Sequence, residues 1–493
     1  MTLPGDPREQ RAFLRHPLVD MLIIAAPSVV QMTSHTLMQF VDSWMVALWG
    51  KDPIYVSAQG NGGFSVWVPM SIIFGMAGVV NSFVSQNLGA GTPAKGARYA
   101  WAQFWISVVA AALMLPLIWL YPRMFEAFGH SEELIRHETQ YATILLAGAV
   151  LPMASKGVAN YFFGMHRPVI PMTAALLGNA ANILANFVLI FGFEPLGIPE
   201  MGLVGAAIGT VIGSAVELVL PAVVFLGPRW ARSFATRASW RPRIKPIGEL
   251  LRVGTPAGLM FVNEMVCFGY LLVVLGGRFG EAQQAAGHIA LRYMSLSFMP
   301  TVGLSIAVTA IVGRLIGMGR LDLAEKRAWL GTGLAVAYMG GCAACFVIFR
   351  EQLIGLFVPE GTPAEEAAEL LQTGALILIA AAVFQVFDAV AVTISGALRA
   401  AGDTLVPSIL TITLSWALIV GGGHLAIELK PEWGVLGPWI GASAYIVVLG
   451  LALLVRFRMG AWKRMRLAEA PPPDADPRAN GPTPDKARPP ADA

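Results

Sequence analysis

Twelve long apolar stretches run through the sequence and leave few alternatives for its fold. Each reaches the length of about 20 residues that an α-helix needs to cross the hydrocarbon core of a bilayer. Of the 493 residues, 56% are hydrophobic and only 13% are charged, whereas a soluble domain has about 25% charged residues. Membrane β-strands would instead show alternating segments of about ten residues. The sequence therefore predicts an all-α polytopic membrane protein with spans near residues 20–49, 55–84, 99–120, 139–161, 170–192, 203–226, 253–275, 285–312, 328–349, 374–396, 406–427 and 435–457.

The basic residues between the spans predict the orientation of the chain. With the N-terminus inside, most Lys and Arg residues of the connections fall on the inner side, and they are dense from Arg229 to Arg252. Positively charged loops stay on the cytoplasmic side of a membrane. We therefore expect a multi-pass protein of the plasma (inner) membrane with both termini in the cytoplasm. The Arg-rich connector also suits contact with anionic lipid headgroups.

Motifs recur along the chain at an offset of about 230 residues. SQNLGAG after the second span matches GRLIGMG after the eighth, and GLVGAAIG in the sixth matches GVLGPWIG in the twelfth. Six spans per copy is an even number, so this predicts a parallel repeat, as known among transporters. The expected parts are a cytoplasmic segment 1–19, an N-lobe 20–228, a basic linker 229–250, a C-lobe 251–458 and a Pro-rich disordered tail 459–493.

The first span carries a polar stripe that is unusual in a membrane helix. Its four members, three or four positions apart and therefore on one helical face, are Gln31, His35, Gln39 and Asp42. A carboxylate is costly against lipid and is tolerated where it faces a bundle interior or a wet cavity. The stripe therefore predicts either a polar contact between helices or the wall of a cavity that binds an ion or a substrate.

Further polar side chains lie at membrane depth in both repeats. The first repeat adds Asn179, Asn182 and Asn186 on one stripe of the fifth span, with Thr210 of the sixth positioned to face them. The second repeat has Asn263 and Glu264 in the seventh span and Phe384, Gln385 and Asp388 in the tenth. A carboxylate among neutral oxygens can bind Na+, because hard cations prefer oxygen ligands, or it can carry a proton. Phe384 either stacks on a cationic substrate or packs in the core.

Other charged residues in the spans have simpler interpretations. We expect Lys156 to reach the membrane interface by extending its side chain. Glu217 lies among apolar residues without an evident partner. His288 and Arg292 share one face of the eighth span and either mark a wet region or compensate an acidic residue of the second repeat.

The order of these motifs resembles the multidrug and toxic compound extrusion (MATE) transporters, in particular the NorM-like branch. The resemblance rests on Pro27 followed by FVDSWMVALWG, on SQNLGAG, and on the asparagine run GNAANILAN of the fifth span. It rests also on Glu264, on AAGHIALRYMSLSFMP and on FDAVAVTISGALRAAGD, and it covers about 440 residues.

The resemblance implies a V-shaped pair of six-helix lobes that export organic cations and other amphiphiles, driven by Na+ or H+ entry. Carried over by position, the N-lobe cation site comprises Asp42, Asn182, Asn186 and Thr210, and the C-lobe site, where Na+ could bind, comprises Glu264 and Asp388. Many relatives have an aspartate where this chain has Asn186, so the N-lobe site has one charge fewer here. The resemblance therefore favours Glu264 and Asp388 of the C-lobe as the coupling residues. The remaining cavity-lining candidates are Gln31, His35, Gln39, Asn179, Asn263, Phe384 and Gln385.

Two other classes of function remain as alternatives. A flippase for a lipid-linked saccharide precursor, on a related fold, would need several cationic residues in its cavity for the pyrophosphate, whereas the charges at membrane depth are mainly acidic. An embedded enzyme would need a catalytic motif, and the spans contain no H-E-x-x-H or G-x-S-x-G. We therefore expect a monomeric transporter of small cationic or amphiphilic molecules in the lipid bilayer, with no cofactor beyond the coupling ion and no nucleic-acid partner.

Overall fold

The computed structural model describes residues 16–358 and 363–468 of the chain. Within these ranges the regular elements are helices, and one isolated bridge joins Phe193 to Ile198. Ten of the described helices are long and apolar enough to cross a membrane, and there are up to twelve spans if each of two bent pairs is counted as one. The structure therefore confirms the expected all-α polytopic fold.

The first six spans form the N-lobe. They are α2 (Pro17–Gly50), α3 (Pro53–Gly89), α4 (Pro93–Met114) with α5 (Leu117–Ala127), α6 (Glu132–Ala147) with α7 (Val150–Gly164), α8 (Val169–Phe191) and α9 (Gly202–Leu226). Asp52 caps α3 by accepting a hydrogen bond of 2.9 Å from the Ile54 amide. The third span bends by 56° between α4 and α5, where Pro116 precedes α5 and cannot donate a backbone hydrogen bond.

The last six spans form the C-lobe. They are α11 (Ile244–Tyr270) with its π-helical continuation Leu271–Leu275, α12 (Glu281–Gly317), α13 (Leu321–Ile348) followed by the short α14 (Arg350–Gly355), α15 (Ala364–Ala401), α16 (Leu405–Leu414) with α17 (Gly422–Leu429), and α18 (Leu436–Arg458). A π-helical stretch, Ser415–Gly421, joins α16 to α17. The connection between the lobes is shorter than the linker expected from the sequence, because α10 (Pro228–Phe234) follows α9 closely and α11 begins at Ile244.

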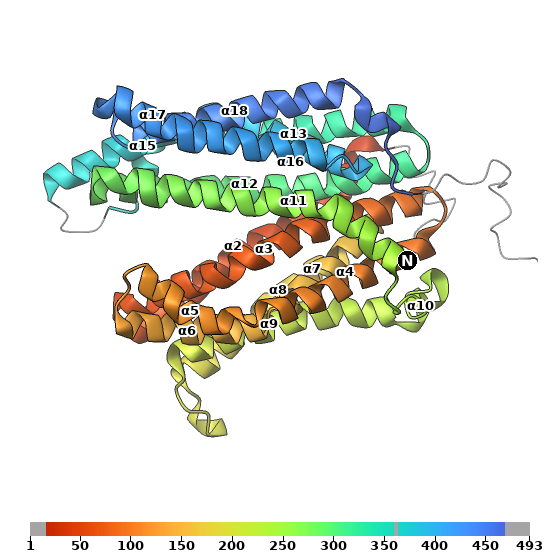
Figure 1. Cartoon of the computed structure of the whole chain (residues 1–493), viewed down its shortest axis with the longest axis horizontal. Coiled ribbons are helices and arrows are strands. Elements are labelled where there is room, and N and C mark those ends of the chain that lie inside the picture. Colours follow the sequence, from red (N-terminus) through yellow and green to blue (C-terminus); the bar gives the residue numbers. More distant parts are fainter. Residues whose placement is uncertain (1–15, 359–362, 469–493) are drawn as a thin grey trace, which may run out of the picture.

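The two lobes meet at one end of the molecule and diverge toward the other (Figure 1). We call the first the closed end; it holds the turn between α3 and α4, residues 227–243 and residues 459–468. The opposite end holds the turn between α5 and α6 and helix α14. The V-shaped arrangement that the sequence resemblance implied is therefore present.

Glycines allow the lobes to approach at the closed half. A Cβ atom on Gly75 of α3 would lie 2.6 Å from the Cα atom of Gly258 on α11, so neither helix could carry a side chain there. Backbone carbonyls of α12 also accept hydrogen bonds from the N-lobe, from Asn81 Nδ2 to Ile306 at 3.1 Å and from the ring of His166 to Ala310 at 3.1 Å. Small residues and interhelical hydrogen bonds are the usual means of joining helices in a membrane.

The start of the tail differs from the expectation. Residues Ala461–Arg464 form a 3₁₀ turn in which Trp462 is fully buried and stacks on Phe457, with ring centroids 5.0 Å apart. Leu467 and Ala468 then donate their amides to Oε1 of Gln86 in the N-lobe, at 2.8 and 3.1 Å. Residues 459–468, expected to belong to a disordered tail, are therefore part of the packed structure, because an aromatic pair and a cross-lobe hydrogen-bond acceptor hold them. The rest of the expected tail, and most of segment 1–19, lie outside the described residues.

Candidate functional site

A buried carboxylate in the N-lobe is bound by an asparagine of a neighbouring helix. Asp42 of α2 is 6% exposed, and its Oδ1 accepts a hydrogen bond of 2.7 Å from Nδ2 of Asn186 on α8. Asn182, one turn earlier on α8, is fully buried beside Asp42. Both amide atoms of Asn182, and Oδ1 of Asn186, have no hydrogen-bond partner among the described residues. Buried polar atoms normally find a partner, so this cluster has oxygen atoms to offer to a ligand.

Tyr141 of α6 completes this cluster, and the sequence did not indicate it. The side chain is 5% exposed and interacts with Asp42, Thr210 and Gln59. Thr210 on α9 also donates its hydroxyl to the carbonyl of Ala206, at 3.0 Å. The expected grouping of Asp42, Thr210 and the asparagines is therefore present in space. Tyr141 lies in an otherwise unremarkable span and joins the cluster only through the packing of α6 inside the lobe.

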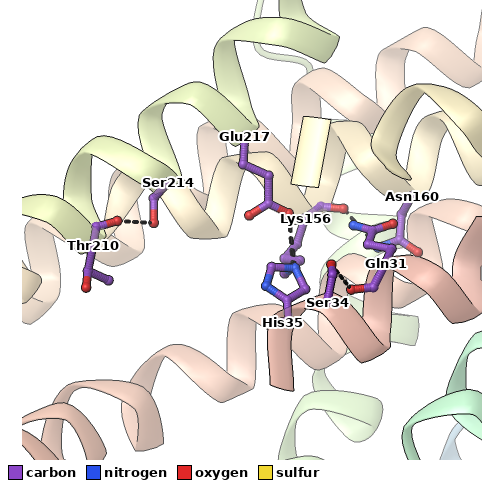
Figure 2. A network of polar contacts seen from close by, with 8 residues as sticks. All are labelled: Gln31, Ser34, His35, Lys156, Asn160, Thr210, Ser214 and Glu217. Carbon is purple, nitrogen blue, oxygen red and sulfur yellow. Dashed lines mark hydrogen bonds and ion pairs between the residues drawn. The ribbon is translucent and has the colours of Figure 1, made fainter. Parts of the chain in front are cut away.

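A second polar cluster lies in the N-lobe where three helices converge (Figure 2). Glu217 of α9 is 8% exposed, and its Oε1 lies 3.3 Å from Nζ of Lys156 on α7 and 3.4 Å from Nε2 of His35 on α2. Nζ of Lys156 is also 3.1 Å from Nε2 of His35. We call these three residues the N-lobe triad.

The triad corrects two expectations. Lys156 does not extend to the membrane interface, because its ammonium group pairs with Glu217 inside the lobe. Glu217, for which the sequence offered no partner, has two. Burial of a charge is tolerated when it is paired and hydrogen-bonded, and the pairing here joins α2, α7 and α9.

The remaining N-lobe candidates differ in their surroundings. Gln31 is 1% exposed, and Figure 2 shows it next to Asn160, close to the triad. Asn179 is 9% exposed, and its Nδ2 has no described hydrogen-bond partner. Gln39, by contrast, is an exposed residue of α2. Of the residues in the polar stripe, Gln31 and Asp42 are therefore buried in the lobe, as expected of a helix contact or a cavity wall, whereas Gln39 is exposed.

The C-lobe brings together the two acidic residues expected there. Oε1 of Glu264 on α11 accepts a hydrogen bond of 3.0 Å from the hydroxyl of Tyr445 on α18. Asp388 on α15 interacts electrostatically with Glu264 and with Tyr445. Tyr445 is 1% exposed and was not indicated by the sequence. Three helices thus place two carboxylates and one phenol oxygen in one cluster.

Two other C-lobe candidates have structural partners. Nε2 of Gln385 donates to Oγ of Ser297, at 2.8 Å, and so joins α15 to α12. Asn263 donates to Ser415 at 2.7 Å and accepts from Trp416 at 2.8 Å, which ties α11 to the π-helical stretch before α17. These amides therefore hold helices together.

The structure distinguishes between the alternatives left open for two side chains near the C-lobe cluster. Phe384 is 1% exposed within the apolar core, so it packs and does not present its ring to a cation. Arg292 lies over the ring of Phe357, 6.0 Å from the centroid, and no ion pair joins it to an acidic residue of the described chain. Compensation of the Glu264–Asp388 cluster by Arg292 is therefore absent.

The order of the helices and the cluster in each lobe can be compared with known proteins. The sequence model of the MatE family matches residues 27–188 and 256–421, one segment in each lobe. The chain belongs to the MatE family. Curated relatives match along nearly the whole length. "Probable multidrug resistance protein NorM" of Pseudomonas putida is 27% identical over 91% of this chain and 95% of its own. "Multidrug resistance protein PmpM" of Pseudomonas aeruginosa is 27% identical over 95% of this chain and 97% of its own.

Solved structures of MATE proteins share the fold of this MatE chain. An outward-facing multidrug resistance MATE family transporter superposes with a TM-score of 0.81 at 22% sequence identity, covering 91% of this chain and 97% of the other. A MATE crystal structure in a straight conformation gives a TM-score of 0.80 at 22% identity, covering 91% and 97%. The family and the fold expected from the sequence are therefore confirmed.

Proposed function

We propose that this MatE protein is a secondary active exporter of organic cations and other amphiphilic compounds, driven by entry of Na+ or H+. The printed names of its relatives, multidrug resistance proteins, support the cargo class. The C-lobe cluster is the observation that supports coupling to an ion. Glu264 and Asp388 interact with each other, and no Lys or Arg of the described chain pairs with either.

Two carboxylates that interact at membrane depth repel each other when both are charged, because the surroundings screen little. A proton on one of them, or a Na+ ion between them, removes this repulsion. The hydroxyl oxygen of Tyr445 would supply a third oxygen ligand for Na+. Residues Asp42, Asn182 and Asn186 form a second candidate cation site, with one carboxylate and amide oxygens that lack partners.

The two lobes would work by alternating access. We infer from the loop charges that the closed end lies on the cytoplasmic side, so that the described state would face outward. An ion bound at the C-lobe cluster moves the equilibrium between states only if it binds one state more tightly. The driving force is adequate, because one charge moved through 100 mV provides about 2.3 kcal/mol. In this scheme the protein acts as a monomer, without catalysis, cofactor or nucleic acid.

The N-lobe triad also favours a cationic cargo over the pyrophosphate of a lipid-linked saccharide. Lys156 is the cation that projects among α2, α7 and α9, and Glu217 neutralises it. The described N-lobe interior therefore offers no excess positive charge to a pyrophosphate group.

The test is export of a fluorescent organic cation by purified protein in liposomes, with Na+ and H+ gradients imposed separately. We expect one gradient to drive export, and Asp388→Asn and Glu264→Gln each to reduce it at least tenfold. Glu428→Gln, an exposed acidic residue of α17, is the matched control and should keep wild-type export. Wild-type export by both cluster variants would refute the coupling role. Absence of export under either gradient, by folded protein, would favour the flippase alternative.

A further inference from the structure

The two repeats of the chain pack reciprocally at the closed end, through the motifs SQNLGAG and GRLIGMG. A Cβ atom on Gly89, in the first motif, would collide with the backbone carbonyl of Arg314 in the second. A Cβ atom on Gly317, in the second motif, would collide with the backbone carbonyl of Gln86 in the first. Glycines of this kind let two membrane helices approach each other closely. Any separation of the lobes at this end must therefore pull these two motifs apart.

The side chain of Gln86 connects the first motif to two separate parts of the C-lobe. It is fully buried, and its Nε2 donates a hydrogen bond of 2.7 Å to the carbonyl of Ala400 at the end of α15. Its Oε1 accepts hydrogen bonds from the amides of Leu467 and Ala468, at 2.8 and 3.1 Å. One N-lobe side chain thus satisfies three backbone groups of the C-lobe, and all three would lose this partner if the lobes separated here.

The segment that provides the two amides is fixed to the C-lobe at its start. We call this segment, residues 459–468, the strap. The indole of its buried Trp462 donates a hydrogen bond of 3.0 Å to the carbonyl of Phe457 in α18. Nζ of Lys463 lies 2.6 Å from Oε2 of Glu325 on α13. The start of the strap therefore belongs to the rigid body of the C-lobe.

The far end of the strap lies across the interface between the lobes. Leu467 packs against an apolar cluster whose buried members come mainly from the N-lobe, among them Phe83 and Leu88 of α3. On its other side Leu467 covers Gly402, which has a φ of +93°, because a Cβ atom there would lie 2.7 Å from a methyl group of Leu467. The strap is thus anchored in one lobe and bound to the other, so it cannot keep both contacts when the lobes separate.

We propose that the strap is a latch that holds the closed end together and has to release Gln86 each time this end opens. The inference rests on the alternating access proposed above. When the end opens, the start of the strap stays with the C-lobe, and the amides of its far end exchange Gln86 for water. Contacts that exist in one state only shift the population toward that state. The strap therefore sets how often the closed end opens.

The first test measures this opening as a distance between two nitroxide labels, by pulsed electron spin resonance. The labels are attached at Ala94→Cys of α4 and Asp322→Cys of α13, which are exposed residues in the N-lobe and the C-lobe. The chain's own cysteines are first replaced by alanine; they are Cys267, Cys342 and Cys345. Truncation after Arg466 removes both strap amides, and truncation after Ala468 is the matched control that keeps them.

We expect truncation after Arg466 to raise the fraction of molecules with a long label distance by about fivefold or more, because several hydrogen bonds of the closed state are lost. Truncation after Ala468 should give the same distribution as the full chain. Identical distributions in the two truncated proteins would overturn the proposal.

The second test asks whether export requires release of the strap. Arg98→Cys of α4 and Ala468→Cys line one cavity of about 220 Å³, so a short bifunctional thiosulfonate reagent can join the strap to the N-lobe there. The matched control joins Glu325→Cys to Lys463→Cys, which ties the strap to its own lobe at an ion pair with partly exposed side chains. We expect the first tether to lower export about tenfold or more, since turnover stops when a required conformational step is blocked. Reduction of the tether should restore export.

The control tether should leave export unchanged, and wild-type export with the tether between the lobes in place would overturn the proposal. Failure of the proposed function gives a different result. If the full chain exports nothing under either gradient, the export assignment fails, while the label distances, which need neither a gradient nor cargo, still decide the role of the strap.

Discussion

Removal of the lysine from the N-lobe triad tests whether the ion pair inside this lobe stabilises the protein. In Lys156→Met the side chain keeps its length and loses its charge, so Glu217 retains only His35 as a partner. The Lys156–Glu217 distance of 3.3 Å corresponds to an attraction of about 5 kcal/mol at an effective dielectric constant of about 20. Desolvation of the two groups opposes this attraction, and loss of one partner from a buried pair costs about 3–5 kcal/mol.

The partial exposure of the two side chains lowers the loss of stability expected from Lys156→Met. The Lys156 side chain is 25% exposed and that of Glu217 is 11% exposed, and the His35 ring stays 3.4 Å from Glu217. We therefore expect Lys156→Met to lower the free energy of unfolding by about 2–3 kcal/mol, at the low end of the range for buried pairs. The double variant Lys156→Met, Glu217→Gln should be less destabilised than Lys156→Met alone, because no unpaired carboxylate remains.

The assay is equilibrium unfolding in mixed micelles of a mild detergent and sodium dodecyl sulfate, for the wild type, both single variants and the double variant. A coupling energy of about 1.5–3 kcal/mol in this cycle would establish the interaction, since independent sites add to within about 0.5 kcal/mol. Lys326→Met, an exposed lysine of α13, controls for the loss of a positive charge. Additive effects in the cycle, or a loss in Lys156→Met no larger than in Lys326→Met, would refute the argument.

Two further substitutions test the contact between the lobes. Gly75→Val would place side-chain atoms where α11 passes, with even the Cβ only 2.6 Å from Gly258 Cα, so we expect export in liposomes to fall at least tenfold. Gly60→Val, on the same helix with no atom within 4 Å of its Cβ, should keep export, and equal effects of the two would count against the close-approach argument. Gln86→Leu would leave the Ala400 carbonyl and the amides of Leu467 and Ala468 without their partner, at about 1–3 kcal/mol for each buried group. We expect faster hydrogen exchange in residues 461–468 of Gln86→Leu, and unchanged exchange would refute the role assigned to Gln86. Truncation after Arg466 should likewise speed exchange at the closed end, whereas truncation after Ala468 should not.

The hydrophobic pattern alone determined the fold class, because lipid excludes every backbone arrangement that does not satisfy its own hydrogen bonds. Long apolar runs could therefore be assigned as spans, and the recurring motifs indicated two lobes. The spacing of the polar residues also predicted which of them share a helical face. A carboxylate such as Asp42 or Glu264 at membrane depth needs an internal environment, so its inward orientation follows from the sequence.

Only the tertiary structure decided which polar groups meet. Lys156 and Glu217 are 61 positions apart, and no helical period relates them, so their pairing depends on how α7 and α9 pack. Tyr141 and Tyr445 reach the two acidic clusters by the same kind of packing, from spans that contain no signal for it. Phe384 lies one turn from Asp388 and yet points into the core, because the neighbours of a helix decide which of its faces is buried. The closed end is the strongest case: Gln86 binds residues more than 380 positions later, and only the contact between the two lobes brings them together.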